Sequence, residues 1–326
     1  MEKGIRRLCW FTLGCGAALA CIILLCWDQA GLLTAAGWAL TIPVLALSRR
    51  HFRIRRLGAL LLGFGVGAGM LLCLQKISYD PLLSLDGTLR EAEILCGKDS
   101  TPGRYSHSAE GTVTIDGKTR GVRVYLPEGV SARAGDRVTG TFRWSVTLPG
   151  GSKAGGGSSG RGVFLTASPK GETEVSPGTE SLWTLPQTLA RAARQAISRC
   201  FPEDAAPFAQ SLLLGDTQDL SYTDETALRV SGIRHIVAVS GLHVAMLFGI
   251  LWLLSGKTPW PAFVVGLPVL WLFAAAAGFT SSVCRACIMS GLLVLAKLTR
   301  RAYDPKTALA AAALGLMVGN PFAIAA

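Results

Sequence analysis

Residues 8–27 have the sequence LCWFTLGCGAALACIILLCW, which contains no charged side chain. The runs 30–47 and 57–74 are also free of charge. An α-helix needs about 20 apolar residues to cross a hydrocarbon core of roughly 30 Å. The three runs therefore predict three membrane-spanning helices. A secretory signal peptide is the alternative for the first run, because a basic leader precedes it.

The overall composition agrees with a membrane protein, since half of the 326 residues are apolar and only 16% are charged. Much of the formal net charge of +11 lies in loops beside the predicted spans. Lys3, Arg6 and Arg7 precede the first span, and five arginines lie within residues 49–56. Short loops rich in Lys and Arg stay cytoplasmic. The N-terminus is therefore predicted inside the cell and the region after residue 74 outside.

Residues 75–185 are predicted to form a small extracytoplasmic β domain. In GTVTIDGKTRGVRVYLPEG (111–129) an Asp-Gly pair separates two β-rich runs, which predicts a hairpin. Five such strands suit a closed barrel of the OB type, with a Greek-key sandwich as the alternative. The predicted strands lie near residues 88–96, 109–116, 119–126, 136–146 and 162–167.

The charge of this β domain is balanced, with 13 Lys and Arg against 12 Asp and Glu. It is therefore no basic patch of the kind that binds DNA by releasing counterions. Most of the nine cysteines fall in predicted spans and are expected to be buried apolar residues. Cys96 and Cys200 are predicted on the oxidising side, so a disulfide between them is left open.

A helix is predicted over LPQTLARAARQAISRC (185–200), which has a proline, Pro186, in its first turn. Its arginines Arg191, Arg194 and Arg199 lie on a polar side, so residues 186–210 are predicted to form an amphipathic helix at the membrane surface. A soluble helix packed on the barrel is the alternative.

The remaining sequence, residues 211–326, predicts four more spans near 233–254, 259–279, 282–298 and 307–326. Basic residues after the first and third of these spans agree with the predicted orientation. The predicted fold is thus an α-helical polytopic membrane protein, with three helices in 1–74 and an inserted extracytoplasmic OB-like domain in 75–185. The chain stops inside the last span, so it is predicted to be part of a longer protein.

Two small-residue pairs in the third span, Gly63 with Gly67 and Gly65 with Gly69, have the four-residue spacing at which helices approach closely. They predict helix packing. Gly232, Ser240 and Gly241 predict a break in the 233–254 helix, or a close backbone approach, of the kind that lines a polar cavity.

Ionisable residues inside the later spans are the first candidates for function, because each costs about 2.5–3.5 kcal/mol to insert in lipid. His235 lies near the start of the 233–254 span, His243 in its middle and Arg285 early in the 282–298 span. Together with the break at Ser240 and Gly241 they predict a polar path. Anchoring at the membrane interface is the alternative for Arg234 and His235, and for Arg285 as well.

No metal or cofactor site is predicted. On a continuous helix His235 and His243 lie about 12 Å apart, too far for two ligands of one zinc ion. An intramembrane hydrolase with Ser240 as nucleophile, His243 as base and Asp216 as acid is an alternative, but no feature of the sequence brings them together. A small-solute transporter or exporter with a closed midplane site is another.

Three motifs resemble the competence domain of the ComEC family. SLLLGDTQDLSYTDETALRVSGIRHIVAVSGLHVAML (211–247) is similar to its opening, in which LLLG precedes an acidic polar stretch and GIxHLLAVSGLHV. GFTSSVCRACIM (278–289) resembles its small-residue and Arg-Ala element, and YDPKTALAAAALGLMVGNPFAI (303–324) its Asp-containing loop, helix and Asn-Pro. The motif positions are Gly215, Asp216, Gly232, His235, Ser240, Gly241, His243, Arg285, Asp304 and Asn320.

The resemblance implies a membrane channel that passes single-stranded DNA during natural transformation. It implies single-stranded DNA, the lipid bilayer and other competence proteins as partners, and leaves a homo-oligomer open. Many family members also carry a C-terminal metallo-β-lactamase-like domain, which this chain does not reach, so no enzymatic activity is predicted for it.

Overall fold

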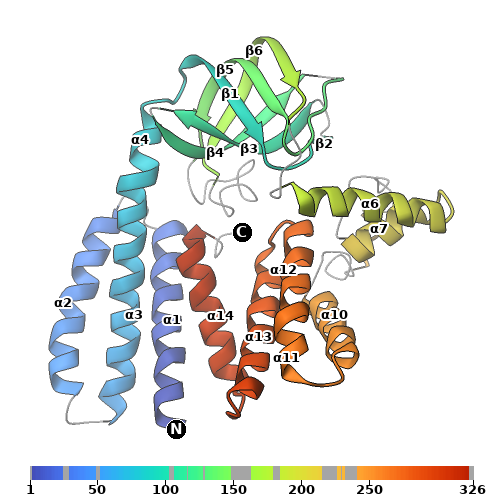
Figure 1. Ribbon diagram of the computed structural model, residues 1–326. Helices are drawn as coiled ribbons and strands as arrows, with labels where there is room; N and C mark the ends of the chain where they lie inside the picture. The colour runs from blue at the N-terminus through green and yellow to red at the C-terminus, as the bar shows by residue number, and fades with distance from the viewer. Residues whose placement is uncertain are drawn as a thin grey trace. The chain divides into compact units, whose positions relative to one another are not determined.

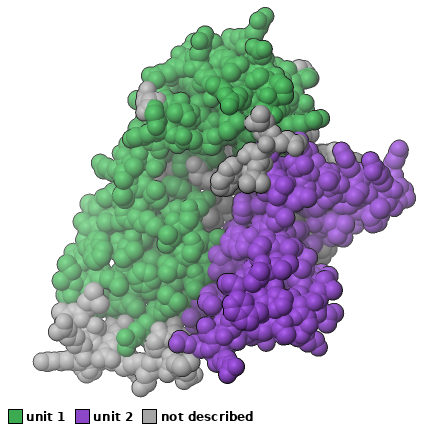
Figure 2. All heavy atoms as spheres, viewed as in Figure 1, with its two compact units in different colours: residues 1–178, 309–326 green, residues 179–308 purple. Residues whose placement is uncertain are grey.

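The computed structural model divides the chain into two compact units, residues 1–178 with 309–326 and residues 179–308 (Figure 2). The structure describes residues 2–24, 29–48, 52–102, 106–115, 117–127, 129–147, 163–178, 184–214, 226–228, 230–231 and 241–322.

The first unit begins with three long helices, α1 (Glu2–Leu24), α2 (Ala30–Ser48) and α3 (Phe52–Leu74), which match the three predicted spans (Figure 1). Helix α3 packs against both of the others. At the α1–α3 contact the two backbones touch, because a methyl group on Gly63 would overlap the carbonyl oxygen of Phe11 and one on Gly14 that of Leu60. The thiol of Cys15 also donates to the carbonyl oxygen of Gly63 at 3.0 Å.

The second small-residue pair faces α2 instead. A methyl group on Gly65 would lie 3.3 Å from the ring of Trp38, and one on Gly69 would lie 3.9 Å from Thr34 and from Trp38. The two glycine pairs of α3 therefore serve two different helices. The prediction that they mark helix packing is confirmed.

Helix α3 continues beyond residue 74 through a π-helical turn, η2 (Gln75–Tyr79), and a short helix, α4 (Asp80–Leu83), up to the β domain. The guanidinium of Arg120 donates to the backbone carbonyls of Ser78 and Ile77 at 3.3 and 3.4 Å. Carbonyls of an irregular helical turn are thus satisfied by a side chain of the β domain.

The β domain is a small closed barrel. Strand β1 pairs with both β5 and β3, and the sheet order is β1-β5-β6-β4-β3-β2. Neighbours are antiparallel except β4 and β6, which are parallel. The strands are β1 (Leu89–Cys96), β2 (Thr101–Pro102), β3 (His107–Ile115), β4 (Lys118–Leu126), β5 (Arg137–Val146) and β6 (Leu165–Ser176).

The barrel confirms the Asp-Gly hairpin, because Ile115 pairs with Lys118 and Gly117 has a positive φ of 74°. Alternate residues such as Phe142 and Trp144 fill the interior and are fully buried. Strand β2 was not predicted, and β6 runs nine residues past the predicted end at 167, to Ser176. That extension is polar and is specified by its pairing with β5, which no local pattern reveals.

Helix α14 (Pro305–Gly319) crosses the boundary between the units, and its later part belongs to the first unit. There the hydroxyl of Thr12 donates to the carbonyl oxygen of Ala310 at 3.4 Å. Beyond the helix, Phe322 packs edge-on against Phe164 of the barrel, with ring centroids 4.6 Å apart. Phe164 packs in turn against Tyr79 at 5.7 Å. This aromatic junction joins the barrel, the π-helical turn η2 and the segment that follows α14.

The second unit contains the helices of residues 179–308. Its buried core consists of Val244, Leu270, Ala274, Val283 and Cys287. The elements are α6 (Leu185–Cys200), α7 (Ala206–Leu214), α10 (Gly241–Leu254), α11 (Pro259–Pro261), the π-turn η3 (Ala262–Gly266), α12 (Leu267–Ala276) and α13 (Ser281–Leu298).

Among the described residues, three helical segments are long and apolar enough to cross a membrane: Arg56–Leu83, Pro259–Ala276 and Ser281–Leu298. Shorter apolar helices cover Arg7–Ile23, Ala30–Val44, Gly241–Leu254 and Pro305–Gly319. The chain is therefore mostly helical, with apolar helices and one small β-barrel, as the sequence predicts.

Cys96 and Cys200, between which the sequence left a disulfide open, are both free thiols in the structure. Cys96 is buried inside the barrel, and burial, with a smaller effect of Asp136, raises its pKa to about 11. A thiol with such a pKa is almost entirely protonated at neutral pH and unreactive.

Candidate functional site

The structure describes five of the ten predicted motif positions: Gly241, His243, Arg285, Asp304 and Asn320. The other five, Gly215, Asp216, Gly232, His235 and Ser240, lie outside the described residues. The arrangement of Ser240, His243 and Asp216 proposed for a hydrolase therefore stays a prediction.

Gly241, the first described residue of α10, lies against the first turn of α13. Its backbone N–H donates to the hydroxyl of Ser282 at 3.3 Å. A methyl group on Gly241 would lie 3.6 Å from the Cβ of Ala286, an ordinary contact distance. The N-terminal ends of α10 and α13 thus meet at these residues. Sequence reasoning did not single out Ser282, because a serine near the start of a helix is common.

His243 lies one residue before Val244, which is fully buried in the core of the second unit. The imidazole is itself half-buried. Successive helical residues are about 100° apart, so Gly241 and His243 lie on opposite flanks of the buried side of α10.

Arg285 lies on the opposite side of α13 from that core. Val283 and Cys287 are buried, and Arg285 is two residues from each of them along the helix. Two residues correspond to roughly 200° around an α-helix. The Arg285 side chain is accordingly exposed. The structure places His243 on α10 and Arg285 on α13, two helices that pack together.

Asp304 caps the N-terminus of α14. Its carboxylate accepts hydrogen bonds from the backbone N–H of Thr307, at 3.2 Å, and from the Thr307 hydroxyl. The hydrogen bond from that hydroxyl is the main reason why the pKa of Asp304 lies below its ordinary value. This is the geometry of an N-cap residue, which satisfies a backbone donor that the helix leaves unpaired.

We expect Asp304→Ala to lower the melting temperature of the purified protein at pH 7, because the cap is lost. The pKa of Asp304 is depressed in the fold, so the cap stabilises the protein above the unfolded pKa of about 4 and is lost as the pH falls below it. The difference in melting temperature between the two proteins should therefore shrink between about pH 5 and pH 3. A difference that is independent of pH would show that Asp304 does not act as a charged cap.

Asn320 ends α14. Its backbone N–H donates to the carbonyl of Leu316 at 2.7 Å, and its side-chain oxygen accepts from the backbone N–H of Phe322 at 3.1 Å. Asparagine favours this turn because its side chain bonds to the backbone two residues on. The turn places Phe322 in the aromatic junction with Phe164. Asn320 therefore has a positioning role that the sequence did not reveal.

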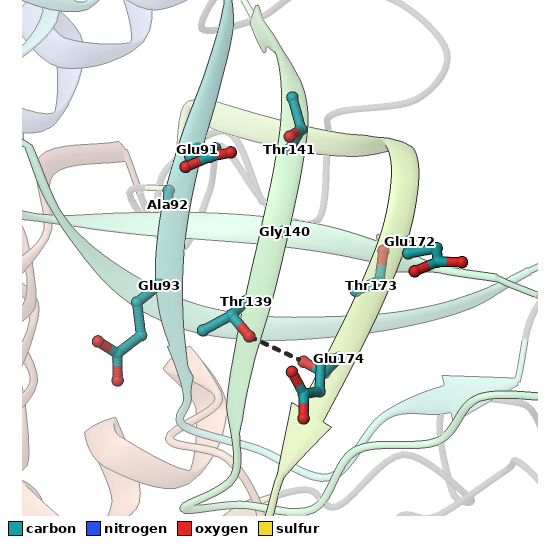
Figure 3. A pocket seen from close by; sticks show the side chains of 9 residues that line it. All are labelled: Glu91, Ala92, Glu93, Thr139, Gly140, Thr141, Glu172, Thr173 and Glu174. Atoms are coloured by element: carbon teal, nitrogen blue, oxygen red, sulfur yellow. Dashed lines mark hydrogen bonds between the residues drawn. The ribbon is translucent and has the colours of Figure 1, made fainter.

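The barrel has a hollow of about 850 Å³ on the outer side of β1, β5 and β6, which Figure 3 shows. Four glutamates line it, with Thr139, Gly140 and Thr141 between them: Glu91, Glu93, Glu172 and Glu174. Only Glu93 has an ion pair within the described part of the chain, with Arg137 at 2.6 Å. Such a surface repels the phosphates of a nucleic acid.

No group of three or more His, Cys, Asp or Glu side chains that could hold a metal ion occurs among the described residues.

Comparisons with known proteins find similarity in the C-terminal third of the chain. A family model described as "Competence protein" matches residues 212–326. ComE operon protein 3 of Bacillus subtilis (strain 168) is 31% identical over 124 residues, which cover 37% of this chain and 16% of that protein. The chain thus matches only about a sixth of the length of this relative.

No solved structure matches the chain. The family match contains every motif that carries the resemblance, from LLLG to Asn320, and it extends over α10, α12, α13 and α14. Residues 212–326 of this chain therefore match the competence-protein family, in the same region that carries the three motifs.

Proposed function

We propose that this protein takes part in the uptake of DNA during competence, and that residues 212–326 contribute to the passage of a single DNA strand across the cytoplasmic membrane. The observation that carries the proposal is the exposed Arg285 on α13, an 18-residue helix apolar enough to span a bilayer.

Arg285 cannot face hydrocarbon at low cost. A guanidinium at membrane depth costs about 2.5–3.5 kcal/mol on insertion scales. The side of α13 that carries it is turned away from the core of Val283 and Cys287. A hydrated passage along that side removes the cost, and a fixed positive charge there attracts the phosphates of a passing strand.

The contact between the N-terminal ends of α10 and α13 also supports passage of DNA into the cell. Their N-terminal ends lie together at Gly241 and Ser282. Each N-terminus carries about half a positive charge from the helix dipole. With residues 75–185 outside the cell and Lys257 and Arg300 inside, both N-termini point toward the outer side, where an incoming phosphate chain arrives.

We further propose that the barrel is of the OB type and lies outside the membrane. Its five main strands close as a Greek-key barrel with one parallel pair, which suits that fold. Its acidic hollow lies on β1, β5 and β6. On the outer side of β3 and β4, Glu110 is shared by Lys98 and Arg123 at 3.2 Å each. That face carries a net positive charge and is the better candidate for contact with DNA.

The test is uptake of radiolabelled DNA by a competent host that lacks the gene. We expect internalised, nuclease-resistant label to disappear while label bound at the cell surface remains, because transport across the membrane is lost and capture is not. Restoring the gene should restore internalisation. Unchanged internalisation in the deletion strain would contradict the proposed function.

A further inference from the structure

Helix α6 exposes an apolar stripe along one of its faces. The stripe comprises Leu185, Leu189, Ala192, Ala196 and Cys200, spaced by four, three, four and four residues along one helical face. All five are exposed, with Leu185 and Leu189 at 45% and 43%. Phe201, which follows the helix, is exposed at 44%.

The rest of the second unit packs against other sides of α6. Helices α7 and α12 both contact α6. The side-chain amide of the buried Gln210 in α7 donates to the hydroxyl of Ser198 at 2.8 Å, and Ser198 belongs to the polar side of α6. Ala190, the one buried residue of the helix, lies to the side of the stripe. The neighbours of α6 therefore cover the side that carries Ala190 and leave the stripe uncovered.

The charge of α6 indicates what covers that side. The helix has three arginines and no acidic residue. Arg199 is exposed and lies at the edge of the stripe, about 60° around the helix from its middle. An apolar stripe edged by arginine fits a phospholipid surface, with the stripe in the acyl boundary and the guanidinium among the headgroup phosphates.

We propose that α6 lies in the surface of the bilayer, with Leu185, Leu189, Ala192 and Ala196 toward the acyl chains and Arg199 on headgroup phosphates. The helix directly follows the barrel and precedes the apolar helices of the second unit. Lipid contact along α6 would thus fix where the chain enters the membrane, independently of any DNA.

The test uses the whole chain in liposomes of phosphatidylcholine and phosphatidylglycerol. Native cysteines are replaced by serine or alanine, and one new cysteine carries an environment-sensitive fluorophore. We expect a label at Ala192→Cys or Ala196→Cys to be quenched about twofold or more by lipids with a spin label near the headgroup, and little by aqueous iodide. The matched control is Gln195→Cys, exposed on the polar side, which iodide should quench.

Adding Arg199→Glu should make the label at Ala196→Cys more accessible to iodide, because a carboxylate is repelled by anionic headgroups. Quenching of the Ala192 and Ala196 labels by iodide alone would overturn the proposal. So would shielding of both labels from both quenchers, since that would mean a protein partner covers the stripe. Neither readout requires DNA, so the outcome is separate from that of the proposed function.

Discussion

Gly63→Ala should destabilise the protein although alanine is the better helix former. The new methyl group would overlap the backbone carbonyl oxygen of Phe11. A flexible side chain could rotate away from the methyl group, but this backbone atom cannot. Helix α1 would have to move off α3, with a cost of about 2 kcal/mol or more from overpacking. The gain in helix propensity, about 1 kcal/mol, does not offset this. We expect a clearly lower melting temperature in detergent.

Gly69→Ala is the matched control on the same helix. Its methyl group would meet only Thr34 and Trp38, both at 3.9 Å, which is ordinary contact. This variant should melt at or above the temperature of the unmodified protein, because alanine has the higher helix propensity and its methyl group meets no clash. Equal melting temperatures for the Gly63 and Gly69 variants would contradict the close α1–α3 contact.

Arg285→Gln should reduce DNA internalisation by about tenfold or more, because it removes the exposed charge near the start of α13, whereas Lys297, the other basic residue of the helix, lies in its last turn. Arg285→Lys keeps the charge and should retain much more of the uptake, although a lysine makes fewer hydrogen bonds to phosphate. Internalised label per cell is measured at equal amounts of protein in the membrane.

Arg300→Gln is the control for loss of one positive charge near the same helix. Arg300 is exposed just beyond the end of α13, on the predicted cytoplasmic side. We expect this variant to take up DNA at nearly the normal level. If Arg285→Gln and Arg300→Gln had equal effects, net charge rather than a lining position would explain the loss.

Local patterns predicted most of the fold. The uncharged runs 8–27, 30–47 and 57–74 became α1 to α3, and the alternating stretches became barrel strands. Helix 185–200 matches α6 (Leu185–Cys200). These elements are specified by apolar period and turn residues within one segment, which a single sequence displays.

The features that were missed depend on segments far apart in the chain. The pairing of Ser176 with Arg137, the hydrogen bond from Gly241 to Ser282 and the packing of Phe322 on Phe164 each join residues more than 35 positions apart. Asp304 and Asn320 were predicted from the resemblance as motif positions. Their observed contacts are helix-ending hydrogen bonds, which act on structure rather than on a substrate.

The most direct test of the central claim is to cross-link DNA in transit. A photoreactive amino acid is placed at position 285 or, as control, at Val264, an exposed apolar residue of η3 expected to face lipid. Competent cells take up radiolabelled DNA and are irradiated. A DNA passage along α13 predicts labelled protein with the probe at 285 and little with the probe at 264. Equal labelling at both positions, or none at 285 while uptake continues, would contradict a DNA passage along α13.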